Sequence, residues 1–210
     1  SLDPENWEEM RELAHRMVDD MFDYIQTSRD RDVWTQVPGE VAGELQSGAP
    51  LDPTPPQDVY EEFTRNILPY NLHTNHPRFW AWYMGSGTVM GAMAEFLAAS
   101  LNPNCGGINH VAPLVEQQVI QWINAMMGFP ESASGLLTSG ASMANFTALT
   151  VARNVNGGYD VRREGVAASP GQLRVYASSE IHSCNQKAIE TLGLGTAGLC
   201  RVAVNPDYTL

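Results

Sequence analysis

The stretch GLLTSGASMANFTALTVAR, residues 135–153, decides the fold of this chain. An apolar run at 136–137 is followed by a turn at 138–140 and then by an apolar, helix-forming segment, which predicts a strand, a tight turn and a helix start. The first turn of a helix has unpaired N–H groups and a partial positive charge. Because Gly140 lets the backbone approach closely and Ser142 offers a hydroxyl group, the turn is a candidate seat for a phosphate. An ordinary strand-to-helix connection capped by a serine fits the same pattern.

The composition is typical of a soluble globular protein, with 43% hydrophobic and 17% charged residues. A net charge of −12 disfavours nucleic acid and anionic membrane surfaces as partners. We find no apolar stretch long enough to span a bilayer and no secretory segment at the start. Cys105, Cys184 and Cys200 are odd in number and irregularly spaced, which indicates reduced thiols, a cytoplasmic location and no metal site among them.

The first 56 residues are predicted to form a helical segment and a linker. A helix start at Asp3-Pro4-Glu5 precedes an apolar stripe with steps of three and four over roughly 20 residues. This stripe needs a partner surface, either in its own domain or on another subunit, and its terminal position favours a dimer contact. Proline and glycine between 37 and 57 predict an extended linker.

Residues 71–87, NLHTNHPRFWAWYMGSG, combine aromatic residues with two histidines and an arginine. A buried aromatic strand would explain Phe79 and Trp80, and we expect one there. The spacing of His73 and His76 is compatible with a pair of metal ligands, but no cysteine or carboxylate stands nearby to complete a site.

Two helices are predicted next, at 88–101 and 113–127, separated by a loop in which Gly106-Gly107 allows unusual backbone angles. The first is rich in small residues suited to close packing. The second has an apolar face that we expect to be buried, made of Leu114, Val115, Val119, Trp122, Ile123 and Met126.

Strands are also predicted at 174–178 and 200–204, with a helix at 182–192 between them. Together with the first strand, this alternation predicts an α/β fold with parallel pairing and right-handed crossovers. Helices of such folds open at the carboxyl edge of the sheet, where ligands bind. Ser142 and His182 each follow a predicted strand, so we expect them to be neighbours across a crevice. A lone histidine is more often structural, but this position makes His182 a candidate for binding a ligand.

Three stretches, in order, resemble the pyridoxal 5′-phosphate (PLP)-dependent group II amino acid decarboxylases, which include the aromatic-L-amino-acid, glutamate, histidine and tyrosine decarboxylases. They are NHPRFWAWYMGSG (75–87), TSGASMANFTAL (138–149) and SSEIHSCNQKA (178–188). The resemblance implies a fold-type I large domain, α/β with a parallel-rich sheet and flanking helices. Residues 1–56 would be the N-terminal helical dimerisation segment and linker, and residues 57–210 the first part of the PLP-binding domain.

The resemblance also implies roles for individual residues. Gly140, Ala141 and Ser142 would hold the cofactor phosphate, and His182 would stack on the pyridine ring, contact the substrate carboxylate and act in catalysis. The substrate side pocket, with an aromatic substrate favoured, would be lined by Trp82, Tyr83 and Met84. The loop from Cys105 to His110 would approach a substrate site, in the same subunit or its partner. Met143 stands where the family often has glutamate and is not expected to touch the cofactor.

The family's cofactor lysine, and the aspartate that pairs with the pyridine nitrogen, lie well downstream of the His182 motif. The only lysine in the chain is Lys187, five residues into the predicted helix, where helical spacing turns it away from the ring face. We therefore expect these 210 residues to be the N-terminal part of a longer, homodimeric enzyme, inactive without its C-terminal half.

The expected activity of the complete enzyme is PLP-dependent decarboxylation of an L-amino acid to the amine and carbon dioxide. Two alternatives stay open. The chain could be a non-catalytic fragment that dimerises or binds cofactor, or it could belong to an aldehyde synthase or another lyase of the same fold.

Overall fold

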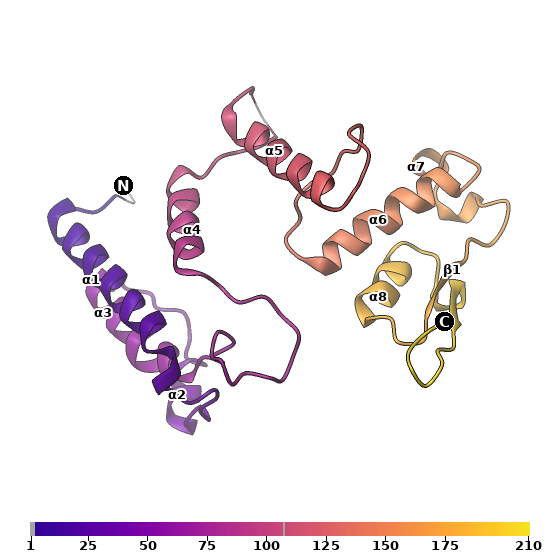
Figure 1. Cartoon of the computed structure of the whole chain (residues 1–210). Coiled ribbons are helices and arrows are strands. Elements are labelled where there is room, and N and C mark those ends of the chain that lie inside the picture. The colour runs from indigo at the N-terminus through magenta and orange to yellow at the C-terminus, as the bar shows by residue number, and fades with distance from the viewer. Residues whose placement is uncertain (1–2, 107) are drawn as a thin grey trace. The chain divides into compact units, whose positions relative to one another are not determined.

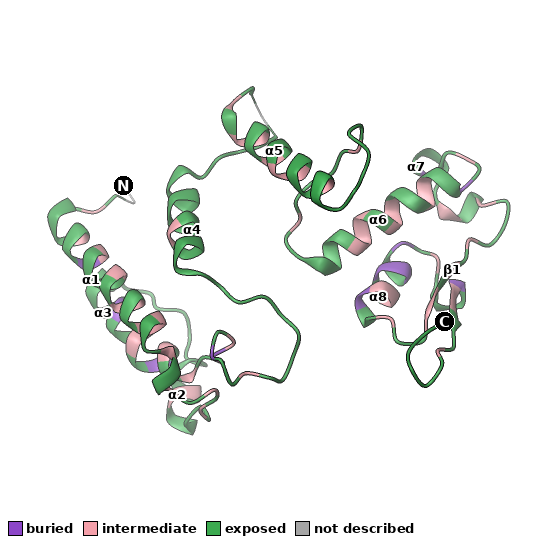
Figure 2. Cartoon of the chain, in the orientation of Figure 1, coloured by how far each residue is buried: buried purple, intermediate pink, exposed green. Residues whose placement is uncertain are grey.

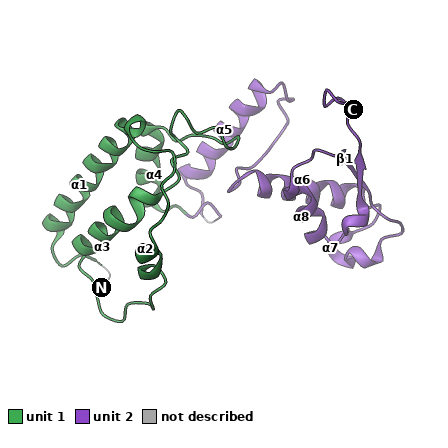
Figure 3. Cartoon of the chain, turned by 90° about the horizontal axis from the view of Figure 1, so that it is seen from below, with its two compact units in different colours: residues 1–103 green, residues 104–210 purple. Residues whose placement is uncertain are grey.

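The structure is a computed structural model that describes residues 3–106 and 108–210. The chain divides into two compact units, residues 1–103 and 104–210 (Figure 3). The boundary predicted after residue 56 concerns the domain organisation of the complete enzyme and stays a prediction. Within this chain, the first unit continues to Pro103.

The first unit is helical (Figure 1), and its α-helices are α1 (Trp7–Gln26), α2 (Gly39–Glu44), α3 (Pro56–Glu62) and α4 (Val89–Leu101). Shorter turns of π-helix (Phe63–Ile67) and 3-10 helix (Ser28–Asp30 and Leu68–Tyr70) connect them. The helix start predicted at Asp3 is wrong, because Asn6 caps α1. Its side-chain oxygen accepts hydrogen bonds from the N–H groups of Glu8 and Glu9, at 3.0 and 3.4 Å.

The extended linker predicted for 37–57 is wrong in part, because α2 lies inside it and α3 begins at its end. Both helices begin next to proline: Pro38 is the residue before α2, and Pro56 is the first residue of α3. Proline fits the first turn of a helix because the N–H group that it lacks would be unpaired there in any case. These prolines therefore start helices that the composition alone suggested they would prevent.

One face of α1 packs against α3 inside the first unit. The Tyr60 hydroxyl donates a hydrogen bond to Asp20 Oδ2 at 2.7 Å, and the guanidinium group of Arg16 lies 4.9 Å from the centre of the Tyr60 ring. Leu13 and Tyr60 are buried there. Other members of the stripe remain exposed, namely Trp7, Met17 and Phe22. Its own unit therefore covers only part of this stripe, and the dimer contact stays a prediction.

The buried aromatic strand predicted at Phe79 and Trp80 is wrong. Both residues lie outside any helix or strand, and Trp80 is 88% exposed. A strand needs a neighbouring strand for its backbone groups, whereas this segment contacts itself. Trp80 Nε1 donates to the Pro77 carbonyl at 3.1 Å, and the rings of Phe79 and Trp82 meet edge to face with centres 5.7 Å apart.

The second unit contains the helices α5 (Val111–Met126), α6 (Ala141–Asn156), α7 (Val161–Glu164) and α8 (Ser183–Thr191), with 3-10 turns at Val166–Ala168 and Thr196–Gly198. Its strands β1 (Val175–Ser178) and β2 (Leu199–Val202) pair in parallel, with Val175 opposite Leu199 and Ser178 opposite Val202. Since α8 connects these parallel strands, the predicted strand–helix–strand order is confirmed for this part of the chain.

The first predicted strand, at 136–137, is wrong: these described residues belong to no strand. The Leu137 N–H group instead donates to Glu116 Oε1 on α5 at 2.8 Å. A side chain thus occupies a backbone donor that a neighbouring strand would otherwise bind. The sheet formed by the described residues has the two strands β1 and β2.

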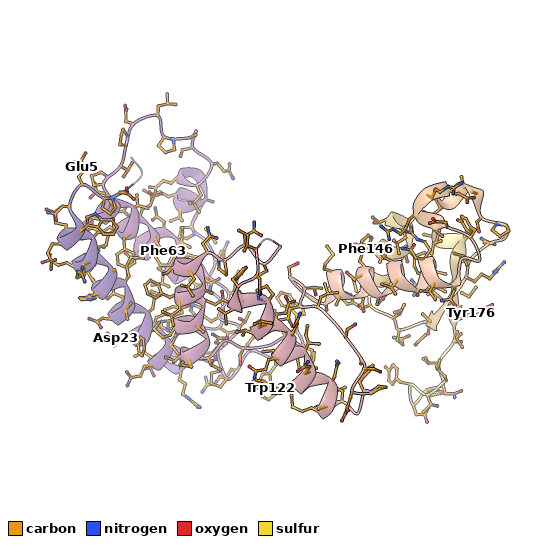
Figure 4. All side chains as sticks on the ribbon, turned by 90° about the horizontal axis from the view of Figure 1, so that it is seen from above. Glu5, Asp23, Phe63, Trp122, Phe146 and Tyr176 are labelled. Carbon is orange, nitrogen blue, oxygen red and sulfur yellow. The ribbon has the colours of Figure 1, made fainter. Side chains whose placement is uncertain are left out.

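The small core of the second unit lies along α8, where Figure 2 shows the buried segments in purple. Ala188, Ile189 and Leu192 are buried, and Arg153 of α6 donates to the Leu192 carbonyl at 2.9 Å. The face of α5 predicted to be buried is exposed instead: Trp122, labelled in Figure 4, is 57% exposed and Met126 is 77% exposed. Within the second unit, the described residues supply no surface that covers this face. Among the helices that the structure describes, none is both long and apolar enough to cross a membrane.

The bond between Tyr60 and Asp20 yields a test of how α1 and α3 are held together. Burial, followed by the hydrogen bond to Asp20, raises the pKa of Tyr60 to about 12. In the unfolded chain the Tyr60 hydroxyl ionises near pH 10. The contribution of the Tyr60–Asp20 bond to the free energy of unfolding is therefore complete below pH 10 and is lost as the pH rises through about 12. We expect Tyr60→Phe to lower the free energy of unfolding in urea by about 1–2 kcal/mol at pH 8.

The matched control is Tyr208→Phe, since Tyr208 is exposed. It should change the free energy of unfolding by less than about 0.5 kcal/mol. Equal stability of the two variants at pH 8 would contradict the contribution assigned to the Tyr60–Asp20 bond.

Candidate functional site

The N-terminal end of helix α6, called its opening below, has backbone N–H groups that make no hydrogen bond within the helix. The first helical hydrogen bond runs from the Ala144 N–H group to the Gly140 carbonyl, at 3.0 Å. The N–H groups of Ala141, Ser142 and Met143 lie ahead of that bond. Within the described part of the chain, no side chain caps this end of α6. The opening therefore presents three N–H donors, an exposed serine hydroxyl and the positive end of a 16-residue helix.

The residue before α6 has a backbone that suits glycine. Gly140 has φ +157° and ψ 170°, a combination that side-chain-bearing residues rarely adopt. A Cβ atom added there would meet nothing within 4 Å. The conformation, and not crowding, therefore favours glycine, and the space in front of the turn is open to a ligand.

Helix α8 opens with His182, which follows β1 after a turn. Its Nδ1 atom accepts a hydrogen bond from the Cys184 N–H group at 3.2 Å, so the imidazole caps the helix. In the neutral ring this bond assigns the proton to Nε2. The His182 side chain is exposed, at the end of the helix next to the carboxyl end of β1.

The two helix openings meet at the thiol of Cys184. Asn145 of α6 donates to Cys184 Sγ at 3.4 Å, and Ser142 and Cys184 line the same groove. Asn145 first, then His182, hold the pKa of Cys184 below its usual value, against the opposing effect of burial. The starts of α6 and α8, which carry Ser142 and His182, therefore lie next to each other at Cys184.

Beside this junction is a groove of about 280 Å³ between α6 and α8. Its lining comes from α6 (Ser142, Met143 and Phe146) and from α8 (Cys184, Lys187, Ala188 and Thr191); Figure 4 labels Phe146 on α6. Lys187, which the sequence placed away from the ring face, thus shares a groove with Ser142. His182 is not one of the described residues that line this groove, so Lys187 and His182 do not meet there.

The residues predicted to line a substrate pocket lie in the first unit, whereas Ser142 and His182 belong to the second. Trp82, Tyr83 and Met84 are all exposed, in a segment without helix or strand. Their role toward a substrate stays a prediction.

The loop predicted to approach a substrate site, Cys105 to His110, includes Gly107, which lies outside the described residues. Cys105 is exposed. His110 caps α5, accepting from the Ala112 N–H group at 3.4 Å, and its Nε2 lies 2.8 Å from the Asn104 carbonyl oxygen. These contacts assign His110 a local structural role.

His73 and His76 are buried and each has its own local partner. His73 Nδ1 lies 2.6 Å from the Asp32 carbonyl oxygen, and its ring meets the Tyr24 ring edge to face. His76 Nδ1 accepts from the Arg78 N–H group at 2.9 Å. Throughout the described ranges, no group of three or more side chains has the arrangement of a metal site.

Sequence reasoning missed two members of the junction, Asn145 and Cys184. For each of these two residues, its spacing from a predicted site residue could have indicated that it lies at the junction. Asn145 lies three residues after Ser142, on the same face of α6, and Cys184 lies two residues after His182. What the sequence could not give is the packing of α6 on α8 that brings the two residues together.

The family model described as the pyridoxal-dependent decarboxylase conserved domain matches residues 38–209. The aromatic-L-amino-acid decarboxylase of Bacillus atrophaeus is 31% identical over 198 residues, which are 93% of this chain and 39% of that protein. Phenylacetaldehyde synthase of Arabidopsis thaliana is 31% identical over 219 residues, 99% of this chain and 43% of that protein.

Among solved structures, Oryza sativa TDC with PLP and tryptamine matches with a TM-score of 0.81 and 23% identity, over 100% of this chain and 47% of that one. Catharanthus roseus tryptophan decarboxylase in complex with L-tryptophan also has a TM-score of 0.81 and 23% identity, over 98% of this chain and 45% of that one. These likenesses confirm the fold, that of part of the large domain of a PLP-dependent decarboxylase.

The chain therefore belongs to the pyridoxal-dependent decarboxylase family, whose cofactor is PLP. It spans about two fifths of the length of the curated relatives named above.

The residues at the junction fit part of this cofactor. A phosphate dianion needs several hydrogen-bond donors and positive potential, and the opening of α6 supplies both. The imidazole of His182, exposed beside it, offers a flat surface for a ring. The chain therefore contains residues suited to the phosphate and to one ring face.

Replacing Gly140 tests the backbone on which this opening depends. We expect Gly140→Ala to lower the free energy of unfolding by about 1–3 kcal/mol, because alanine is strained at φ +157°. The measurement is urea unfolding. Gly171→Ala is the matched control, since a Cβ atom at Gly171 also meets nothing within 4 Å. Equal stability of the two variants would show that this turn tolerates a side chain.

Proposed function

We propose that this chain is the cofactor-holding first part of a PLP-dependent decarboxylase, which converts an L-amino acid to its amine and carbon dioxide. One observation carries the proposal: the openings of α6 and α8 meet at Cys184 in a chain of this family. The C-terminal region of the same enzyme would supply the cofactor lysine. The exposed apolar faces of α4 and α5 support such a partner, because side chains such as Phe96 and Trp122 need a covering surface.

The opening of α6 would bind the phosphate of the cofactor. The Ser142 hydroxyl and the N–H groups of Ala141, Ser142 and Met143 can all donate toward one anion. The partial positive charge of the helix end adds to this attraction. Because these groups belong to a helix packed on α8, little ordering is needed when the anion binds.

His182 would hold the pyridine ring from one face. Its bond from the Cys184 N–H group fixes the ring's position and leaves an N–H group at Nε2, which can donate a hydrogen bond to a substrate carboxylate. When bound, PLP supplies the electron sink that accepts the electrons of the bond between Cα and the carboxylate. The residues of this chain would therefore provide orientation and one hydrogen-bond donor from His182.

We infer an aromatic side chain for the substrate. Trp82, Tyr83 and Met84 form an exposed apolar run that could contact an aromatic ring. The names of several relatives also specify aromatic amino acids, including tyrosine and tryptophan. The N-terminal helix would serve a homodimer through Trp7, Met17 and Phe22, which its own unit leaves exposed.

A second candidate is an aldehyde synthase. Phenylacetaldehyde synthase is among the relatives at 31% identity, the same value as for the aromatic-L-amino-acid decarboxylase. Such an enzyme would consume oxygen and release an aldehyde with ammonia and hydrogen peroxide in place of the amine. The product therefore distinguishes the two activities.

The decisive assay uses the protein that carries this chain, loaded with PLP, and amino acids labelled at the carboxyl carbon. We expect labelled carbon dioxide from L-tyrosine, L-tryptophan or L-phenylalanine and little from L-glutamate, with the amine as the organic product. An aldehyde with peroxide would select the second candidate. Bound PLP without carbon dioxide from any amino acid would identify a non-catalytic protein and reject the proposal.

Two variants separate the capping role of His182 from its catalytic role. Asparagine also caps helices, so His182→Asn should keep the free energy of unfolding within about 0.5 kcal/mol, whereas His182→Ala should lose about 1 kcal/mol. Both variants lack the imidazole, and we expect kcat to fall by about a hundredfold or more in each. Wild-type turnover by His182→Asn would show that the histidine only caps α8.

A further inference from the structure

Cys184 is the buried group at the junction to which the reaction assigns no role. It is 8% exposed, whereas Cys105 is exposed and Cys200 is half-buried. Its N–H group binds His182 Nδ1, and its sulfur binds the side chain of Asn145. No other thiol in the described part of the chain lies at this junction.

Cys184 adds a polar contact between two elements that otherwise meet through apolar packing and through the hydrogen bond from Arg153 to the Leu192 carbonyl. Through its own backbone it belongs to α8 and orients His182 at 3.2 Å. Through its sulfur it contacts α6, by way of Asn145 at 3.4 Å. A displacement of this sulfur would therefore move Ser142 and His182 relative to each other.

We propose that Cys184 is a positioning residue, which fixes the distance between the phosphate-binding opening of α6 and the ring-covering imidazole of His182. The inference rests on the proposed function, since it assumes that one PLP molecule contacts both openings. A rigid cofactor can satisfy both contacts only if their spacing is set beforehand, so contacts at the sulfur should contribute to affinity without touching the cofactor.

The test compares three variants of the protein that carries this chain, titrated with PLP. Cys184→Ala removes the sulfur contact, whereas Cys184→Ser keeps a hydroxyl that can accept from Asn145. Cys200→Ala is the matched control, because Cys200 lies on β2 away from the junction. The measurements are the Kd for PLP and the circular dichroism of the bound cofactor, which reports the orientation of its ring.

We expect Cys184→Ala to bind PLP about tenfold more weakly and with altered circular dichroism, because it loses the hydrogen bond from Asn145. Cys184→Ser should restore both quantities to within about threefold of wild type, and Cys200→Ala should leave them unchanged. A wild-type Kd and spectrum for Cys184→Ala would overturn the inference, even if that variant were less stable. Failure of the wild-type protein itself to bind PLP would reject the proposed function instead.

A measurement on the unaltered protein covers the case in which Cys184→Ala does not fold. N-ethylmaleimide is added with and without PLP, and the labelling rate of each cysteine is followed by mass spectrometry. We expect PLP to slow the labelling of Cys184 at least about fivefold, because a cofactor bound to both openings holds the junction closed. Cys200, on β2, serves as the internal control. Equal slowing of both thiols, or no slowing of Cys184, would overturn the inference.

Discussion

The candidate site depends on the contact between α6 and α8, and above all on the hydrogen bonds that meet at Cys184. Neither helix opening alone would be a cofactor site, since many helices begin with unpaired N–H groups or with a histidine cap. Cys184 joins the two openings: its sulfur accepts from Asn145 of α6 at 3.4 Å, and its N–H group donates to His182 Nδ1 at 3.2 Å. Behind it, Ile189 and Leu192 form the buried core that keeps α8 in place.

This junction is the well-packed part of a chain that leaves much apolar surface exposed. Helices α4 and α5 are apolar, yet Phe96, Trp122 and Met126 remain accessible to solvent. In the first unit, α1 covers one face of α3 and leaves Trp7 and Phe22 open. An apolar surface of this kind is typical of an element that packs against a further polypeptide segment. The junction at Cys184, by contrast, is held by contacts inside a single unit.

Much of the local structure could be predicted from the sequence because short-range signals determine it. The turn before α6, the strand at β1 and the capping position of His182 follow from glycine, β-branched residues and the spacing of apolar residues. The wrong strand predictions at 136–137 and at Trp80 have one physical cause. A strand forms only where another strand pairs with it, and the sequence of one segment does not determine whether a partner strand is available. The same limit explains why Cys184 and Asn145 were missed, because their contact joins residues 39 positions apart.

The most direct test of the central claim is a crystal structure of the protein with PLP. The account predicts the cofactor phosphate within hydrogen-bond distance of the Ser142 hydroxyl and of the N–H groups at the start of α6, with the pyridine ring stacked on the imidazole of His182. A phosphate bound at another place, or a ring remote from His182, would contradict the claim that these two helix openings hold one cofactor.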